Sequence, residues 1–175
     1  MAVKEIARAK AWHWKLVCCG GRREAFDAFL HARGTGDMSV VVLLVDSEGP
    51  MAGSPCGHLA AQDGWDLKGV SDDLVHLMVQ VMETWIVADV AALAAYYRQG
   101  FSTSPLPKAG NLEAVAKSTI ASALDRATRA TQKGAYHKVR HAGDLLRQID
   151  PNKVKQRCPA CARMLETLGA LIREA

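Results

Sequence analysis

Three acidic residues stand at the ends of hydrophobic stretches in this chain. Asp46 and Glu48 follow the aliphatic run 40–45. Glu83 comes shortly after the alternating stretch 75–81. Carboxylate oxygens bind Mg²⁺ or Mn²⁺, and metal-assisted phosphodiester chemistry needs several of them around the ion. The alternative is an Asp that merely caps the turn after a strand, but the paired acids favour Asp46, Glu48 and Glu83 as metal ligands and catalytic residues.

Hydrophobic patterning predicts the elements that would position these acids. Residues 40–45 are rich in valine, which is typical of a fully buried strand, and 75–81 alternate with a period of two. Residues 13–19 indicate a further short strand, and the apolar spacing over 23–33 predicts a helix after it. A strand–helix–strand unit begins a parallel sheet, and ligand sites of such sheets lie beyond the carboxyl ends of the strands.

The second half of the chain lacks strand signals. Residues 47–70 are rich in Gly and Pro and are expected to form a long loop. Helices are expected over 86–97, 118–131, 137–149 and 152–175. The sequence therefore predicts a single α/β domain over 1–175. Residues 12–97 would hold a small, mostly parallel sheet flanked by helices, and 98–175 would form a basic helical half.

Charge is distributed unevenly along the chain. Residues 1–97 carry 8 Lys or Arg and 12 Asp or Glu, whereas 98–163 carry 13 and 4. A basic half beside an acidic one suggests a polyanion, and nucleic acid is the expected partner. The alternative is a set of solvated helix faces. The candidate nucleic-acid-binding residues are Arg22, which follows a Gly-Gly turn, and a basic segment with Lys133, Tyr136, His137, Lys138 and Arg140.

Composition restricts the class of protein. No apolar run reaches the roughly 18 residues of a membrane span, and the first residues lack the apolar core of a secretory signal, so a cytoplasmic protein is expected. The five cysteines include Cys158 and Cys161, spaced like half of a zinc site. Because zinc requires four ligands and no second pair fits, we expect an incidental pair and no zinc.

Several segments together resemble a known family. They are, in chain order, Cys19-Gly20-Gly21-Arg22, Leu44-Val45-Asp46-Ser47-Glu48, Asp63-Gly64-Trp65, His76-Leu77-Met78-Val79-Gln80, Met82-Glu83, Lys133-Gly134-Ala135-Tyr136 and Asp150-Pro151. They resemble the prokaryotic family catalogued as domain of unknown function 4276, whose fold is Toprim-like, over roughly residues 16–168.

The resemblance implies a Toprim-like site, which binds Mg²⁺ through a Glu on a first strand and an Asp-x-Asp on a later one. Asp46 and Glu48 match the Asp-x-Asp, with Glu in the second place. Family members usually begin with a Val-Glu-Gly-Gly strand, but this chain has Met1-Ala2-Val3-Lys4-Glu5 there, so the core over 12–97 is expected to lack that first strand and its Glu. Many Toprim-like relatives act in phage defence beside an ABC-type ATPase.

Two functions follow from this sequence. The first is a metal-dependent nuclease, or a subunit derived from one, that acts on DNA or RNA. The alternative is a non-catalytic interaction subunit of a defence complex with an ABC-type ATPase.

Overall fold

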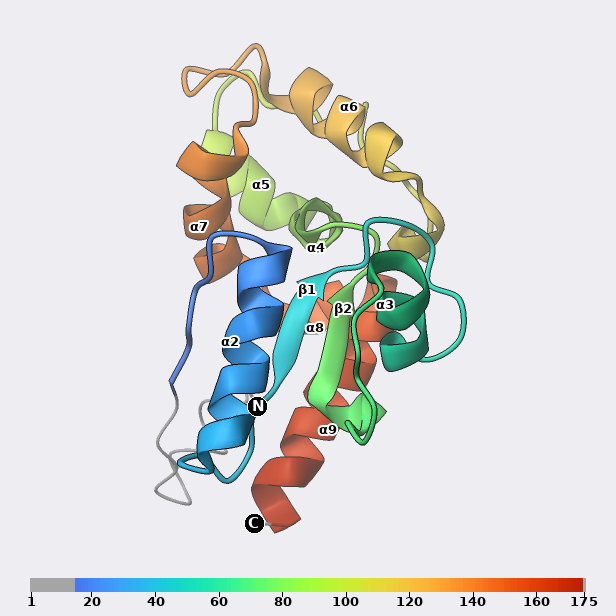
Figure 1. Ribbon diagram of the computed structural model, residues 1–175. Helices are drawn as coiled ribbons and strands as arrows, with labels where there is room; N and C mark the ends of the chain where they lie inside the picture. The colour runs from blue at the N-terminus through green and yellow to red at the C-terminus, as the bar shows by residue number, and fades with distance from the viewer. Residues whose placement is uncertain (1–14, 175) are drawn as a thin grey trace. The chain divides into compact units, whose positions relative to one another are not determined.

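The computed structural model describes residues 15–174 (Figure 1). The chain folds into two compact units that alternate along the sequence. Of the described residues, 15–46, 51–77 and 163–174 belong to the first unit, and 47–50 and 78–162 belong to the second. None of the helices in 15–174 is long and apolar enough to cross a membrane.

Two parallel strands, β1 (Leu43–Asp46) and β2 (Val75–Met78), form a small sheet. Except for Met78, the strands belong to the first unit. The helix α2 (Arg22–Thr35) lies alongside β1 (Figure 1) and buries Phe26 and Phe29 on its inner face. Because Gly36 adopts a left-handed conformation with φ of 69°, it ends this helix at little steric cost.

The connection from β1 to β2 contains a second helix, α3 (Pro55–Asp63), and the short 3-10 helix η1 (Asp72–Leu74). Ser54 caps α3 by accepting a hydrogen bond from the backbone N–H of Gly57, and Pro55 occupies the first turn. Trp65 follows the helix and stacks on Phe26, with 4.4 Å between ring centroids. The connection is therefore held to α2 by an aromatic contact.

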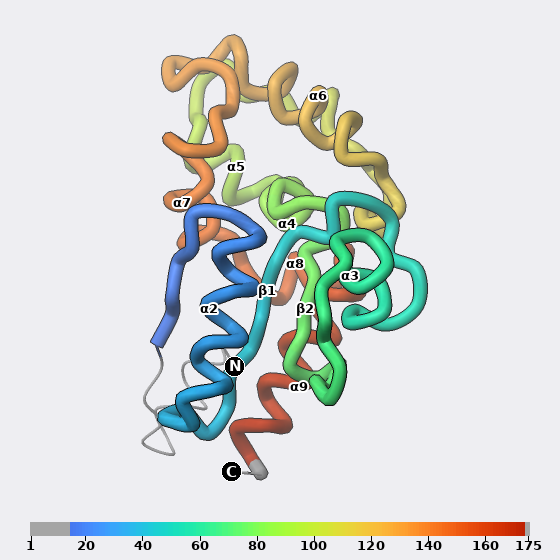
Figure 2. The backbone as a smooth tube through the Cα atoms, in the orientation of Figure 1, coloured from blue at the N-terminus to red at the C-terminus, as the bar shows by residue number. Residues whose placement is uncertain are grey.

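The second unit is built around α4 (Met82–Ala88), the start of its helical part. Residues 84–88 are all buried, as expected for a short helix that is apolar on every side. Helices of the same unit contact it. In chain order the unit contains α5 (Val90–Tyr97), the 3-10 helix η2 (Leu112–Ala114), α6 (Lys117–Thr128), α7 (Lys138–Gln148) and α8 (Pro151–Arg157) (Figure 2). The last helix, α9 (Pro159–Glu174), begins in this unit and continues in the first.

Asp89 joins three of these helices. It separates α4 from α5 and caps α5 through a hydrogen bond from the backbone N–H of Ala92. Its other oxygen accepts from the backbone N–H of Asp150, and the Lys153 ammonium lies 2.9 Å from Oδ1. Burial alone would raise the pKa of Asp89, but the hydrogen bonds from Asp150, Lys153 and Ala92 hold it below its usual value.

The predicted fold class, α/β with a helical C-terminal half, is confirmed. The strand predicted over 13–19 is wrong for residues 15–19, which have no regular structure, and 13–14 lie outside the described residues. Leu16 and Val17 in that segment are exposed, so their apolar character did not signal a buried strand. The predicted loop 47–70 contains α3, whose Ser-Pro start signal the Gly and Pro content obscured.

The helical predictions were correct in type and less so in extent. The helix predicted over 86–97 starts at Met82 and is interrupted at Asp89, which caps the second segment. The helix predicted over 152–175 is likewise two helices, because Pro159 lacks the N–H that would continue α8.

Candidate functional site

The first candidate group in the second unit centres on Glu48. Its backbone adopts the left-handed conformation, with φ of 61°, which is uncommon for a residue with a side chain. The backbone N–H of Glu48 donates to the carbonyl oxygen of Gln80 at 2.8 Å, just beyond the end of β2. One carboxylate oxygen accepts a hydrogen bond from the Lys117 ammonium at 2.8 Å. The turn therefore directs Glu48 toward the start of α6.

Gln80 positions the partner of this glutamate. The residue is only 5% exposed, and its side-chain oxygen accepts from the backbone N–H of Lys117 at 3.2 Å. Its amide nitrogen donates to the carbonyl of Glu113 at 3.5 Å. Because the α6 N-terminus has no side-chain cap of its own, Gln80 supplies an acceptor for one of the helix's open N–H groups.

The second candidate group centres on Glu83, in the first turn of α4. Its side chain is 13% exposed. Oε1 accepts a hydrogen bond from the Tyr136 hydroxyl at 3.0 Å, and the Lys138 ammonium lies 3.9 Å from Oε2. The backbone N–H of Tyr136 in turn donates to the Thr128 hydroxyl at 2.7 Å. Glu48 and Glu83 thus each face a lysine, and we call Glu48–Lys117 and Glu83–Lys138 the glutamate–lysine pairs.

A buried histidine supports the segment that carries Lys138. His141 Nδ1 accepts from the backbone N–H of His137 at 3.1 Å and lies 3.0 Å from the Tyr97 hydroxyl. A backbone N–H can only donate, so Nδ1 carries no proton and the tyrosine must donate as well. Burial lowers the pKa of His141, and the charges of Arg140, His137 and Lys133 lower it further. His141 is therefore a neutral structural group at the start of α7.

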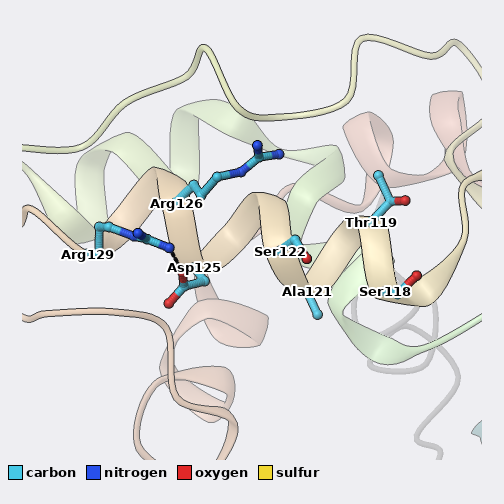
Figure 3. A pocket seen from close by; sticks show the side chains of 7 residues that line it. All are labelled: Ser118, Thr119, Ala121, Ser122, Asp125, Arg126 and Arg129. Atoms are coloured by element: carbon cyan, nitrogen blue, oxygen red, sulfur yellow. Dashed lines mark hydrogen bonds and ion pairs between the residues drawn. The ribbon is translucent and has the colours of Figure 1, made fainter.

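The outer face of α6 is polar and basic. A shallow hollow along this helix is lined by hydroxyl and guanidinium side chains, namely Ser118, Thr119, Ser122, Arg126 and Arg129, together with Ala121 and Asp125 (Figure 3). Arg129 pairs with Asp125, whereas Arg126 extends away from that pair. Hydroxyl and guanidinium groups are the side chains that commonly contact phosphates in nucleic acids. The helix has 12 residues, so this face is roughly 18 Å long.

A comparison with known protein families identifies the chain's relatives. A family model described as "Domain of unknown function (DUF4276)" matches residues 6–169. The chain belongs to this family. No curated protein and no solved structure matches it. The family resemblance drawn from the motifs is confirmed, and the Toprim-like aspect stays a prediction.

The predicted metal ligands of this DUF4276 chain lie in both units. Asp46 is the last residue of β1, 8% exposed, in the first unit, and Glu48 and Glu83 belong to the second. In residues 15–174, no three or more His, Cys, Asp or Glu side chains are grouped so as to hold a metal ion. The metal assignment stays a prediction. The start of the chain, where the family's first strand is expected to be lacking, falls in residues 1–14, outside the described residues.

The predicted nucleic-acid-binding residues fall into separate places. Tyr136 and Lys138 meet at Glu83, and the Lys133 ammonium lies 4.5 Å from the centroid of the Tyr96 ring. His137 and Arg140 are exposed at the start of α7.

Arg22 belongs to the first unit. It makes two 2.7 Å hydrogen bonds to Asp63 and lies over Trp65, so its guanidinium is engaged in the fold of this DUF4276 chain. The nucleic-acid role of Arg22 stays a prediction.

Sequence reasoning gave no role to Gln80 and little weight to Lys117. Gln80 carried one available signal, since a glutamine directly after a buried strand must find hydrogen-bond partners. Lys117 carried none, because its partner Glu48 is 69 residues away in sequence.

The cysteine pair of the DUF4276 chain is buried. Cys158 and Cys161 are free thiols at the start of α9, and burial raises the pKa of each to about 12. Nearby Glu113 accepts from the backbone N–H of Ala160 at 2.9 Å, and burial raises its pKa to about 7. Such thiols carry almost no thiolate near neutral pH, which makes them inert as nucleophiles.

Proposed function

We propose that this chain acts on nucleic acid as a metal-dependent nuclease, or as a subunit derived from one, with a Toprim-like core. The observation that carries the proposal is the pair of glutamate–lysine contacts in the second unit. Glu48 and Glu83 follow the two strands of the sheet, and each holds a lysine ammonium. Cleavage of a phosphodiester requires cations near the phosphate oxygens. It also requires a carboxylate that can transfer a proton or bind a metal ion.

The charge of the second unit supports a polyanionic substrate. Its residues, 47–50 and 78–162, contain 12 Lys or Arg and 7 Asp or Glu, a net charge of +5. The helix α6 begins at Lys117, and its outer face carries hydroxyl and guanidinium groups. A strand bound along this helix would place its phosphates beside Lys117 without needing base-specific contacts.

The donor atoms of the two glutamates fit a divalent cation in kind, because Mg²⁺ and Mn²⁺ prefer carboxylate oxygens. In the structure these oxygens face ammonium groups, so an ion would bind at Glu48 or Glu83 in exchange for a lysine contact. When bound, the metal would neutralise phosphate charge and lower the pKa of water. Lys117 and Lys138, beside these carboxylates, would supply the cations for a phosphate.

The remaining residues act by positioning. Gln80 fixes the N-terminus of α6 and hence Lys117, and the Tyr136 hydroxyl orients Glu83 through one hydrogen bond. Thr128 holds the backbone of Tyr136.

The test is cleavage of plasmid DNA and of RNA by the purified full chain with Mg²⁺ or Mn²⁺. We expect cleavage to require the metal and to be lost in Glu48→Gln, Glu83→Gln and Asp46→Asn. Glu166→Gln is a matched control, because Glu166 is exposed on α9. Glu48→Gln should keep nucleic-acid binding, since it leaves the Lys117 cation in place without its carboxylate. Equal cleavage by all variants, or none by the wild-type chain, would contradict the proposal.

A second function is favoured by the same contacts. Because Glu48 and Glu83 already have cationic partners, they need no metal to be stable, as in a non-catalytic subunit. We propose as the alternative an interaction subunit of a phage-defence complex with an ABC-type ATPase. Calorimetry with Mn²⁺ separates the two functions. Binding that is lost in Glu48→Gln and kept in Glu166→Gln supports the enzyme, and no binding to the wild-type chain supports the interaction subunit.

A further inference from the structure

A second hollow in the second unit has a different lining. It has a volume of about 1180 Å³ and is lined by residues from the end of α5, from the segment that follows α6 and from α7. Its polar and aromatic lining consists of Tyr96, Tyr97, Arg98, Gln99, Gln132, Lys133 and Gln148. We call it the Tyr96 pocket. None of the residues of the glutamate–lysine pairs lines it.

The walls of the Tyr96 pocket are held together closely. Gly100 has φ of 86°, and a Cβ at this position would lie 2.3 Å from the carbonyl oxygen of Ala130. Only glycine permits this approach of two backbone segments. The backbone N–H of Ser102 also donates to the carbonyl of Ala127 at 3.0 Å, which ties the same two segments together. The pocket is therefore a built feature of the fold.

An aromatic ring and a cation lie together in the pocket. The Lys133 ammonium lies 4.5 Å from the centroid of the Tyr96 ring, a distance typical of a cation–π contact. Tyr97 and His141 meet Tyr96 at interplanar angles of 81° and 62°, so neither ring is stacked on it. These contacts fix the ring's orientation, while the flexible Lys133 side chain can move aside for a planar ligand.

Four polar side chains of the pocket have no polar partner in residues 15–174. The side chains of Arg98, Gln99, Gln132 and Gln148 make no hydrogen bond or ion pair with any described residue. Among the described lining residues none is acidic. Asp144 acts electrostatically on Tyr96 from nearby, but its carboxylate is paired with Arg147 at 2.8 Å. The pocket thus offers amide donors and acceptors and two cations to a ligand.

We propose that the Tyr96 pocket binds a nucleoside phosphate. The base stacks on Tyr96, the glutamine amides hydrogen-bond its edge, and Lys133 and Arg98 hold the phosphate. Aromatic rings combined with basic side chains are the means by which proteins hold unpaired bases, and glutamine amides match the donor and acceptor pairs of base edges. The ligand is either a free nucleotide or an unpaired nucleotide of a single strand. The inference does not depend on the proposed cleavage, because the pocket shares no residue with the glutamate–lysine pairs.

The test measures binding of two probes by the full chain at low salt. Fluorescence anisotropy follows a labelled single-stranded oligonucleotide of about ten nucleotides, and calorimetry follows adenosine 5′-monophosphate. Loss of one stacking contact weakens binding about tenfold or more. We therefore expect Tyr96→Leu to weaken at least one probe by that factor, and Tyr96→Phe to bind like the wild type. Lys133→Ala should also weaken binding, whereas Lys155→Ala, which removes the same charge from α8, should not.

If Tyr96→Leu does not fold, a second variant still tests the inference. Gln132 is exposed and its side chain has no partner among residues 15–174, so Gln132→Leu leaves the fold intact and should still weaken binding. Oligonucleotide binding alone identifies a single strand as the ligand, and binding of the monophosphate identifies a free nucleotide. Wild-type failure to bind either probe, or equal binding by wild type, Tyr96→Leu and Gln132→Leu, overturns the inference. If the chain binds through Tyr96 but cleaves neither DNA nor RNA, the proposed binding pocket stands and the proposed nuclease activity is refuted.

Discussion

The replacement Asp89→Ala should destabilise the chain more than the removal of an exposed carboxylate would. Asp89 is 2% exposed and accepts from Ala92, Asp150 and Lys153. Loss of the α5 cap costs about 1 kcal/mol. Loss of a charged acceptor for a second backbone N–H costs about 1.5 kcal/mol, and loss of the ion pair to the half-exposed Lys153 costs up to about 1 kcal/mol. We therefore expect a loss of about 3 kcal/mol in the free energy of unfolding.

The assay is urea and thermal unfolding of the full chain. A loss of about 3 kcal/mol corresponds to a fall in Tm of about 6–12 °C for a chain of this size. Asp144→Ala is the matched control, because it also removes a carboxylate from an ion pair, but an exposed one with Arg147. We expect this control to lose less than about 1 kcal/mol. A difference of less than about 1 kcal/mol between the two variants would refute the capping role of Asp89.

The effect of Asp89 should also depend on pH in one direction. Its pKa lies below the ordinary value of 3.8 in the folded chain, so the folded state favours the carboxylate. The stabilisation is therefore fully present above that value and is lost as pH falls through the lower folded pKa. The stability difference between wild type and Asp89→Ala should stay constant from neutral pH to about 5 and shrink in stronger acid. A difference that grows on acidification would contradict this reasoning.

One further substitution and one chemical treatment test other parts of the structure. Gly100→Ala should destabilise the second unit by about 2 kcal/mol or more, because a side chain at φ of 86° is strained and its Cβ meets Ala130. Thermal unfolding measures this loss of stability. Gly110→Ala is the control, because the space around Gly110 is open. Cys158 and Cys161 should react with a thiol reagent only after denaturation, because burial raises the pKa of each to about 12. The exposed Cys18 should react at once in the native chain. Rapid labelling of all the thiols in the native chain would instead show that α9 opens readily.

Local patterning predicted those elements whose signals were strong. Of the valine-rich run 40–45, only residues 43–45 became part of β1, and Leu44 is exposed although the run predicted a fully buried strand. The alternation from Val75 became β2 over its first four residues. The strand prediction was wrong for residues 15–19, because apolar residues are buried only where another element covers them. The helix α3 was missed, since its Ser54-Pro55 start lies among glycines and prolines that suggested a loop.

For the candidate site, the sequence identified the acids and not their partners. Glu48 and Glu83 stand where the strand pattern ends, so their positions could be read from hydrophobic periodicity. Lys117 and Tyr136 reach these acids from 69 and 53 residues away, and nothing in the local sequence encodes such a contact.

The sequence by itself determined the α/β class, the family, the helical C-terminal half and the uneven distribution of charge. Each depends on residue type and on spacing within one element or motif. Only the tertiary structure decided that Glu48 and Glu83 each face a lysine and that Arg22 is bound by Asp63. It also decided that Tyr96 and Lys133 share a pocket with glutamines whose side chains make no hydrogen bond to residues 15–174. The physical reason is that charge pairing and pocket lining depend on distances between side chains that chain folding sets and local propensity does not.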